Sequence, residues 1–225
     1  MKNQYRVDRE YISKEWGLIL LVISLFILGA IFYPRLPEKV PSHWNAKGEV
    51  DQYSSRFWGA FGMPIMIALL YLGLLYIPYI DPKRENYIRF ESTYRIIRVL
   101  IVLIFSILQI VLLGVVLTGK NYLISRLVPA LIGVMFIFIG NFLPKVKYNW
   151  FLGVRTPWTL SNEEVWRKTH KFSGYLFVIG GLLMLLGAFL SPPMNFIVGV
   201  GGILFVSILS IVYSFYVFKR LVKNQ

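Results

Sequence analysis

The chain contains no cysteine, and this absence excludes a disulfide framework and any metal site built on thiolates. Charge is also scarce, since charged residues make up 16% of the 225 residues, whereas a soluble domain carries about 25%. Long windows hold no Asp, Glu, Lys or Arg at all, and these windows cover residues 16–33, 57–80, 99–119, 127–144 and 172–218. A helix needs about 20 apolar residues to cross a bilayer, so the windows predict an integral membrane protein.

The apolar windows predict six membrane-spanning helices in a single domain that covers residues 1–225. The last window is long enough for two crossings with a turn at 191–195. The expected fold class is therefore an all-α, polytopic membrane protein. Its spans are expected at about 15–33, 57–80, 93–118, 123–142, 172–190 and 195–218.

The predicted spans also lack groups that couple transport to ions. Ion-driven transporters keep carboxylates, histidines or basic residues near the middle of the membrane, and none of the six apolar segments contains one. Gln109 lies near the middle of its span, where we expect it to hydrogen-bond to a neighbouring helix; contact with a substrate is the alternative. No nucleophile–base pair, phosphate-binding loop or metal motif is visible, so we expect no enzyme, no cofactor and no metal centre.

The basic residues are distributed as a topology signal. A net charge of +13 could suggest nucleic acid, but three quarters of the Lys and Arg residues lie in four segments, at 1–14, 81–98, 145–171 and 219–223. These segments alternate along the chain with less basic loops, and cytoplasmic loops of membrane proteins carry the excess of positive charge. We therefore expect both termini in the cytoplasm, residues 34–56 outside, membrane lipids as the surroundings, and no direct contact with nucleic acid.

The external loop at 34–56 has the composition of an ordered binding surface. Three prolines bias its first part toward extended backbone, and Asn45-Ala46-Lys47-Gly48 is typical of a turn in which Gly48 adopts a positive φ. Rigid aromatic and turn residues make good binding surfaces. The candidate ligand-binding residues are His43, Trp44, Asn45, Gly48 and Asp51.

Two other interpretations of this loop remain open. Trp44 and Tyr53 could simply anchor it at the membrane interface, where such aromatic residues are enriched. A metal site formed by His43, Glu49 and Asp51 is a weaker alternative, because one histidine and two loop carboxylates are a poor zinc set.

The cytoplasmic stretch 149–170 reads NWFLGVRTPWTLSNEEVWRKTH. Gly153 and Pro157 break a helix approaching from either side. Ser161 and Glu164 have the spacing of a capping box, which predicts a short interfacial helix between the fourth and fifth spans. The candidate residues for docking a partner or for latching the loop are Asn149, Gly153, Arg155, Thr156, Pro157, Trp158, Glu164, Trp166 and His170.

Arg155 lies between two turns of this stretch and has two possible roles. Its guanidinium could pair with Glu163 or Glu164 and latch the loop beneath the helices, or it could clamp a carboxylate or phosphate of a partner. His170 is expected to make a headgroup or backbone contact. Catalysis by His43 or His170 is the least supported alternative for the protein.

The two loops together resemble the SdpI family of bacterial membrane proteins. PSHWNAKGEVDQY follows the first span, and GNFLPKVKYNWFLGVRTPWTLSNEEVWRKTHKFSG lies between the fourth and fifth spans. The core of the second motif contains Gly153, Arg155, Thr156, Pro157, Trp158 and Thr159, followed by Val165, Trp166, Thr169 and His170.

The resemblance implies a protein of the bacterial plasma membrane that gives immunity to a secreted antimicrobial peptide. For some members of the family it also implies signalling, in which the membrane protein sequesters a cytoplasmic transcriptional repressor. The expected partners are thus a toxin peptide at the outer loop and a repressor at the inner loops. The alternative is a transporter that exports a hydrophobic peptide or a lipid-like molecule.

Overall fold

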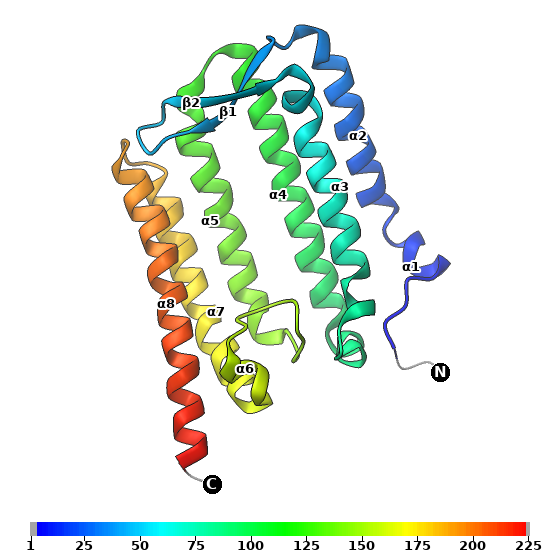
Figure 1. Cartoon of the computed structure of the whole chain (residues 1–225), viewed down its shortest axis with the longest axis vertical. Helices are drawn as coiled ribbons and strands as arrows, with labels where there is room; N and C mark the ends of the chain where they lie inside the picture. Colours follow the sequence, from blue (N-terminus) through cyan, green and yellow to red (C-terminus); the bar gives the residue numbers. More distant parts are fainter. Residues whose placement is uncertain (1–3, 224–225) are drawn as a thin grey trace.

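A computed structural model describes residues 4–223 and contains the six expected membrane-spanning helices (Figure 1). The prediction of an all-α, polytopic membrane protein is confirmed, since each helix is long and apolar enough to cross a bilayer. Lys2, which belongs to the basic N-terminal segment, lies outside the described residues. The helices are α2 (Trp16–Phe32), α3 (Arg56–Ile80), α4 (Glu91–Thr118), α5 (Ile124–Phe142), α7 (Glu163–Gly187) and α8 (Met194–Lys223).

Shorter elements connect the spans. Two are α-helices, α1 (Arg9–Ser13) and α6 (Pro157–Ser161), and two are strands, β1 (Lys39–Trp44) and β2 (Val50–Ser55). Single 3₁₀ turns or short 3₁₀ helices complete the connections, at η1 (Tyr33–Arg35), η2 (Arg84–Phe90), η3 (Asn121–Leu123) and η4 (Leu143–Lys145).

The expected interfacial helix is not a separate element at the position that the sequence suggested. α7 starts at Glu163 and continues without a break into the fifth span, so the residues after Ser161 form its first turns. The predicted capping box of Ser161 and Glu164 is wrong, because Asn162 caps α7: its side chain accepts hydrogen bonds from the backbone N–H groups of Glu164 and Val165. The short helix in this connection is α6, which precedes Asn162.

The six spans pack as two groups. The first half-bundle contains α2, α3 and α4, and the second contains α5, α7 and α8, with α4 and α5 in contact between them. In the second half-bundle, glycines bring two helices close together: an ideal Cβ at Gly140 on α5 would lie 2.7 Å from the carbonyl oxygen of Gly174 on α7. Gly133 and Gly181 make an equivalent pair seven residues along each helix. Small residues at such spacings are typical of membrane helices whose backbones approach closely.

Gln109 has the interhelical role expected for it. Its side chain is fully buried on α4, and Nε2 donates a 3.3 Å hydrogen bond to the carbonyl oxygen of Ala60 on α3. The bond ties two helices of the first half-bundle together.

The loops segregate to opposite ends of the bundle (Figure 1). β1 and β2 form an antiparallel hairpin across one end, where the α4–α5 and α7–α8 turns also lie. The opposite end carries α1, η2, the connection 143–162 with α6, and both ends of the described chain. The alternation of six spans therefore places the two loops with candidate site residues on opposite faces.

Candidate functional site

The hairpin is attached to the first half-bundle at its base. Val40 on β1 is 1% exposed and fills the space above Gly59 of α3, where an ideal Cβ would lie 2.7 Å from the Val40 side chain. Val40 packs with Leu36, Ala60 and Leu113 in a small apolar cluster. Burial of these side chains fixes the strands on α3 and α4, so the hairpin tip projects in a defined direction.

The tip is a tight turn of the kind that the sequence predicted. The side chain of Asn45 accepts hydrogen bonds from the backbone N–H groups of Lys47 and Glu49, at 2.9 and 3.1 Å. Gly48 has φ +79°, a conformation that costs glycine least. An ideal Cβ at Gly48 would meet Ser125 of α5 at 3.4 Å and Pro192 of the α7–α8 turn at 3.7 Å. The tip thus rests on the second half-bundle.

A pocket of about 260 Å³ lies between this tip and the second half-bundle. Trp44, Asn45, Ala46 and Gly48 form its hairpin wall. The opposite wall is mostly apolar and comes from three helices, with Ile124, Ser125, Val128, Pro129 and Ile132 on α5, Met184 on α7, and Asn195, Phe196 and Val200 on α8. We call this cavity the hairpin pocket.

Two polar groups give the hairpin pocket hydrogen-bonding character. The indole Nε1 of Trp44 is buried and has no hydrogen-bond partner among the described residues. Asn195 is 3% exposed, and its Nδ2 donates a 2.8 Å bond to the carbonyl oxygen of Ser125, which ties α8 to α5 at the pocket wall. A buried N–H without an acceptor is unfavourable.

The predicted outer site therefore divides into two parts. The structure brings Trp44, Asn45 and Gly48 together at the hairpin pocket. His43 and Asp51 do not line the pocket; they form an exposed pair, with His43 Nδ1 2.6 Å from Asp51 Oδ1. Glu49, the third residue of the weak metal alternative, instead accepts a hydrogen bond from Asn45 at 3.1 Å, and the described residues contain no group of three His, Asp or Glu side chains suited to a metal.

At the other end, Asn149 organises the start of the connection 143–162, which we call the inner loop. Its fully buried side chain accepts hydrogen bonds from the backbone N–H groups of Phe151 and Leu152, and Nδ2 donates to the carbonyl oxygens of Lys147 and Leu152. Four bonds from one amide fix residues 147–152 as a compact turn.

Gly153 of the inner loop packs against His170 in the first turns of α7. His170 is fully buried and stacks on Trp166 with ring centroids 3.9 Å apart. Its Nε2 accepts a 3.1 Å hydrogen bond from the backbone N–H of Val154, so Nδ1 carries the proton and donates to the carbonyl oxygen of Trp166. Gly153 has φ +119°, and an ideal Cβ there would lie 2.1 Å from Nε2 of His170. His170 thus makes backbone contacts, as the sequence suggested.

Thr156, Pro157 and Trp158 attach the loop to α8. Thr156 caps α6 by accepting a hydrogen bond from the backbone N–H of Thr159, with Pro157 as the first helical residue. The hydroxyl of Thr156 lies 3.0 Å from that of Ser214 on α8, and the ring of Trp158 packs against Phe215 with centroids 5.0 Å apart. The motif therefore connects the loop to the final helix.

The pairing of Arg155 with Glu163 or Glu164, one of the two roles considered for it, is not formed. Arg155 is exposed, and its guanidinium donates a 2.9 Å hydrogen bond to the carbonyl oxygen of Trp150 within the same loop. Glu164 pairs with Arg167 at 2.7 Å and with Lys168 at 3.2 Å, because those residues lie one turn further along α7. Helical spacing satisfies the glutamate locally and leaves Arg155 available on the surface.

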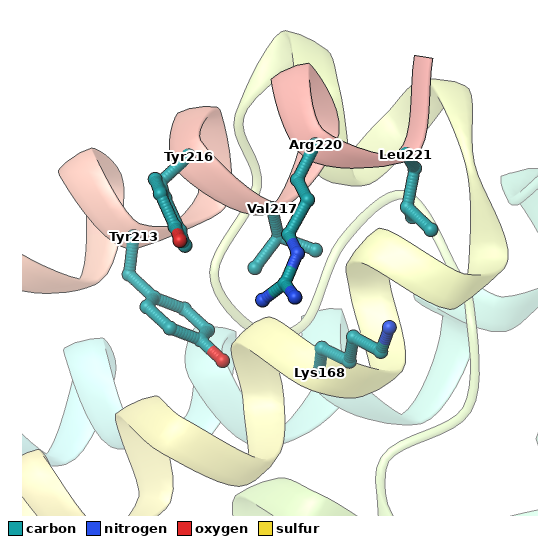
Figure 2. Close-up of a pocket in the computed structure, with 6 residues that line it drawn as sticks. All are labelled: Lys168, Tyr213, Tyr216, Val217, Arg220 and Leu221. Carbon is teal, nitrogen blue, oxygen red and sulfur yellow. The ribbon is translucent and has the colours of Figure 1, made fainter. Parts of the chain in front are cut away.

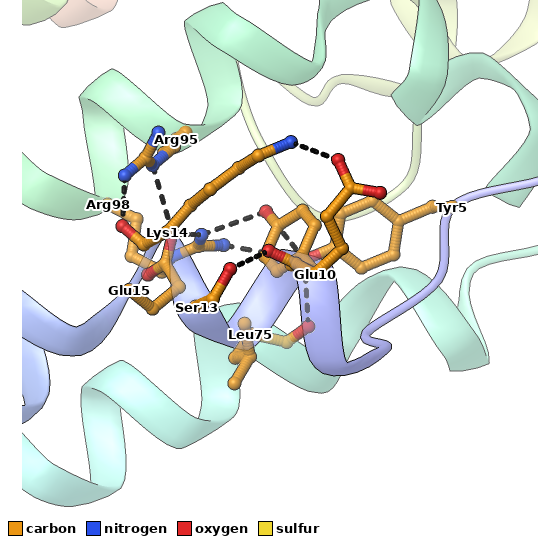
Figure 3. A network of polar contacts seen from close by, with 9 residues as sticks. Tyr5, Glu10, Ser13, Lys14, Glu15, Leu75, Arg95 and Arg98 are labelled. Carbon is orange, nitrogen blue, oxygen red and sulfur yellow. Dashed lines mark hydrogen bonds and ion pairs between the residues drawn. The ribbon is translucent and has the colours of Figure 1, made fainter.

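A buried ion pair is a feature that the sequence analysis missed (Figure 3). Glu15 and Arg98 both have fully buried side chains, and Arg98 donates to Oε1 of Glu15 at 2.8 Å and to the hydroxyl of Tyr11 at 2.9 Å. Each residue stands at the edge of an apolar window, where it looks like an ordinary flanking charge. The sequence signal that could have indicated the cluster is the tyrosines near these two charges. Tyr5, Tyr11 and Tyr94 all contact Arg98 in the structure.

Tyr5 closes the cluster from the N-terminal segment. Its hydroxyl donates to the carbonyl oxygen of Leu75 at 3.2 Å, and Arg84 donates to its backbone carbonyl at 2.7 Å. Burial raises the pKa of the Tyr5 phenol above its ordinary value, so the hydroxyl keeps its proton and remains a donor. The network holds residues 5–15 against α3 and α4.

A second missed cluster joins η2 to the inner loop. Asp81 is 4% exposed, and its Oδ2 accepts hydrogen bonds from the hydroxyl of Tyr87 at 2.7 Å and from the backbone N–H of Trp150 at 3.0 Å. Asn86 donates to the carbonyl oxygen of Tyr148 at 2.8 Å. These bonds connect the two half-bundles at the end opposite the hairpin.

The two regions described above coincide with matches to known families. Residues 145–217, which contain most of the inner loop, α6, α7 and most of α8, match the SdpI/YfhL protein family. Residues 19–68, which contain the hairpin, match a domain of unknown function, DUF1648. The chain is also 24% identical over 203 residues to the immunity protein SdpI of Bacillus subtilis strain 168, an alignment that covers 90% of this chain and 95% of that protein.

The chain is therefore similar to the SdpI/YfhL family over residues 145–217. Its resemblance to that family was carried by the loop motifs alone, whereas the alignment with the Bacillus subtilis relative extends over nearly the whole length of both proteins. No solved structure matches the chain significantly. The hairpin pocket joins the two matched segments, since its walls include Trp44 from the first and Met184 from the second.

Proposed function

We propose that this protein is a bacterial immunity protein of the plasma membrane, which protects its cell from a secreted antimicrobial peptide bound at the hairpin pocket. Its relationship to an immunity protein supports the general activity. The observation that carries the site is the pocket itself, which lies beneath an ordered hairpin tip and has a mostly apolar wall.

The distribution of charge supports an orientation with the pocket outside the cell. The basic segments 81–98 and 145–171 lie at the same end as the two ends of the described chain, opposite the hairpin. Positive charge is retained on the cytoplasmic side of bacterial membrane proteins. This orientation exposes the hairpin pocket to a secreted peptide and places the inner loop in the cytoplasm.

The size of the pocket limits what it holds. Pockets for whole small molecules have volumes of about 300–1,000 Å³, and the hairpin pocket has about 260 Å³. It therefore accommodates one large apolar side chain of a peptide, with a neighbouring peptide carbonyl accepting from Trp44 Nε1. The exposed pair of His43 and Asp51 gives the outer face of the hairpin a polar contact for the remainder of the peptide.

Survival of a toxin-sensitive bacterium that expresses this chain tests the proposal. Wild type should protect against a sporulation-delaying-type peptide, and Val128→Phe, which fills the pocket, should abolish protection. Trp44→Phe keeps an aromatic ring but removes the N–H, and loss of one hydrogen bond should lower the tolerated peptide concentration by about fivefold. Trp58→Phe is the matched control, because Trp58 is 57% exposed at the same end and does not line the pocket.

Full protection by Val128→Phe and Trp44→Phe, at wild-type levels of inserted protein, would contradict the site. Export of a hydrophobic peptide or lipid-like molecule, the alternative function, predicts transport as well as binding. Labelled peptide that accumulates in inverted vesicles only when the protein is present would favour that alternative. Binding without accumulation would favour immunity by capture.

The inner face supports a finer proposal, the sequestration of a cytoplasmic transcriptional repressor. Another pocket, of about 210 Å³, lies there between η2 and α7, and its lining contains three basic residues, Arg89, Lys147 and Arg167, and one acidic residue, Glu163. Such a basic surface suits an acidic segment of a partner. Arg89→Gln with Lys147→Gln should release a co-expressed repressor from the membrane fraction, whereas Lys171→Gln should not; unchanged retention in the double variant would reject this docking site.

A further inference from the structure

A cavity of about 400 Å³ lies between α7 and α8, at the end of these helices opposite the hairpin pocket (Figure 2). Lys168 lines it from α7, and Tyr213, Tyr216, Val217, Arg220 and Leu221 line it from α8. Neither proposed activity uses these residues. We call this cavity the α7–α8 pocket.

The α7–α8 pocket is positively charged. Figure 2 shows the guanidinium of Arg220 extending from α8 into the space above α7, and it makes no ion pair with any acidic side chain in the described part of the chain. Lys168 contacts Glu164 at 3.2 Å, but the same carboxylate oxygen is held more closely by Arg167, at 2.7 Å. The two cations that line the pocket therefore exceed the negative charge available to them.

Hydroxyl groups and an apolar floor complete the pocket. Tyr213 is held in place by its ring, which stacks on Phe172 of α7 with centroids 4.0 Å apart. Figure 2 shows the hydroxyl of Tyr213 directed away from the α8 backbone, toward α7. Val217 is only 5% exposed and supplies the apolar base. Cationic and hydroxyl donors beside buried apolar side chains suit a ligand that combines a phosphate with hydrocarbon.

The position of the pocket along α8 indicates which of these ligands it binds. The uncharged window that began at 172 ends at residue 218, so Arg220 lies just beyond the apolar belt, and Tyr213 and Tyr216 lie at its edge. Phospholipid phosphates lie at this depth, and tyrosine is enriched there. Toward the membrane interior both helices expose apolar side chains to lipid, with Ile179 on α7 and Val212 on α8 about half exposed.

We propose that the α7–α8 pocket binds the headgroup phosphate of an anionic membrane phospholipid. Arg220 and Lys168 contact the phosphate, the tyrosine hydroxyls donate to its oxygens, and the acyl chains continue along the exposed apolar surface of α7 and α8. Free phosphate shares the headgroup chemistry but lacks the hydrocarbon, so the hydrocarbon distinguishes the two ligands.

The test compares lipid retention by the full-length protein purified in mild detergent. Phosphatidylglycerol should remain bound in native mass spectra and raise the melting temperature, whereas phosphatidylcholine at equal concentration should do neither. Arg220→Gln and Lys168→Gln should each weaken phosphatidylglycerol binding about fivefold, and the double variant about 25-fold, since each cation near an anionic lipid surface contributes a similar amount. Lys219→Gln is the matched control, because it removes the same charge from the neighbouring position of α8 without lining the pocket.

Two further measurements test the hydroxyl of Tyr213 and distinguish a lipid phosphate from free phosphate. Tyr213→Phe retains the ring that stacks on Phe172 and should weaken binding by a few fold, without lowering the melting temperature of the lipid-free protein. Inorganic phosphate at millimolar concentration should not displace the lipid. Equal binding of phosphatidylglycerol to the double variant and to Lys219→Gln would overturn the proposal, and so would displacement of the lipid by inorganic phosphate.

Discussion

Gly153 carries two constraints at one backbone position. Its φ of +119° is strained for a residue with a side chain, and an ideal Cβ would lie 2.1 Å from Nε2 of His170. The strain and the clash cost about 1–3 kcal/mol each. Because the same histidine nitrogen accepts the Val154 N–H, a displaced ring would also leave a backbone donor without its partner.

We therefore predict that Gly153→Ala lowers the free energy of unfolding by about 3 kcal/mol. Thermal unfolding of the purified protein measures the effect. Gly73→Ala is the control, since a Cβ at Gly73 meets nothing within 4 Å, and alanine is the better helix former. Equal melting temperatures for Gly153→Ala and wild type would show that the inner loop does not require this geometry.

The sequence predicted where the site residues lie better than it predicted their hydrogen-bond and ion-pair partners. The sequence identified Gly153, Asn149 and His170 as members of one stretch, and in the structure Asn149 fixes the start of the loop while Gly153 packs against His170 of α7. One of the two roles it offered for Arg155, pairing with a glutamate, is not formed, because Glu164 has closer cations one turn away on its own helix. It also missed the pairing of Glu15 with Arg98, which depends on how α1, α2 and α4 pack and so has no signature in local spacing.

At the scale of whole elements, the close contact between α5 and α7 depends on two pairs of glycines, because these residues have no side chain. A Cβ at Gly140 would lie 2.7 Å from the backbone oxygen of Gly174 and 2.8 Å from the backbone nitrogen of Val178. Backbone atoms cannot rotate away as a side chain can. The two helices would have to separate along their length to accept even one methyl group.

The expected result for Gly140→Ala is a loss of about 1–3 kcal/mol of stability, because overpacking in a close interface costs this much. Denaturation in detergent should show an earlier transition than for wild type. Gly114→Ala lies in an equally apolar stretch of α4, where an added methyl group meets nothing within 4 Å, and it should leave the transition unchanged or raise it slightly. Identical transitions for both variants would mean that α5 and α7 are free to shift apart.

The spans were predictable because membrane insertion depends on local composition: a run of about 20 apolar residues is sufficient to indicate a helix. The strands β1 and β2 were not predicted. Each strand is six residues long, and β1 contains a proline at position 41, which argues against a strand. The hairpin is held by the contact of Val40 with Gly59, two segments that only the folded chain brings together. The sequence correctly predicted the turn at 45–48 because its chemistry is contained in those residues.

The molecule as a whole is two half-bundles connected at both ends. The hairpin tip makes the outer connection, and Asp81, Tyr87, Asn86 and the inner loop make the other. Asp81 is the central acceptor of the inner connection, since it receives hydrogen bonds from the backbone N–H groups of Lys83 and Trp150 and from the hydroxyl of Tyr87. Removal of its carboxylate would leave the two backbone donors without their acceptor, and Tyr87 with only its 3.4 Å contact to Asn149.

For Asp81→Ala we predict detachment of the inner loop from η2 without loss of the six spans. Hydrogen bonds to a charged acceptor contribute about 1.5–3 kcal/mol each, so the amide of Trp150 should exchange with solvent at least tenfold faster. Hydrogen exchange followed by mass spectrometry resolves this segment. Glu85→Ala removes the same charge from an exposed position in η2 and should leave the exchange rate unchanged; slow exchange in Asp81→Ala would contradict the assigned connection.

The hairpin pocket has an implication for how such proteins diversify. One wall is built from residues 44–48, and the other from α5, α7 and α8, more than seventy positions further along the chain. A ligand bound in the pocket contacts both of these parts of the chain. Moving the hairpin alone into a homologue would thus transfer only one wall of the pocket, and an exchange of selectivity requires the tip and the pocket-lining parts of α5, α7 and α8 to be exchanged together.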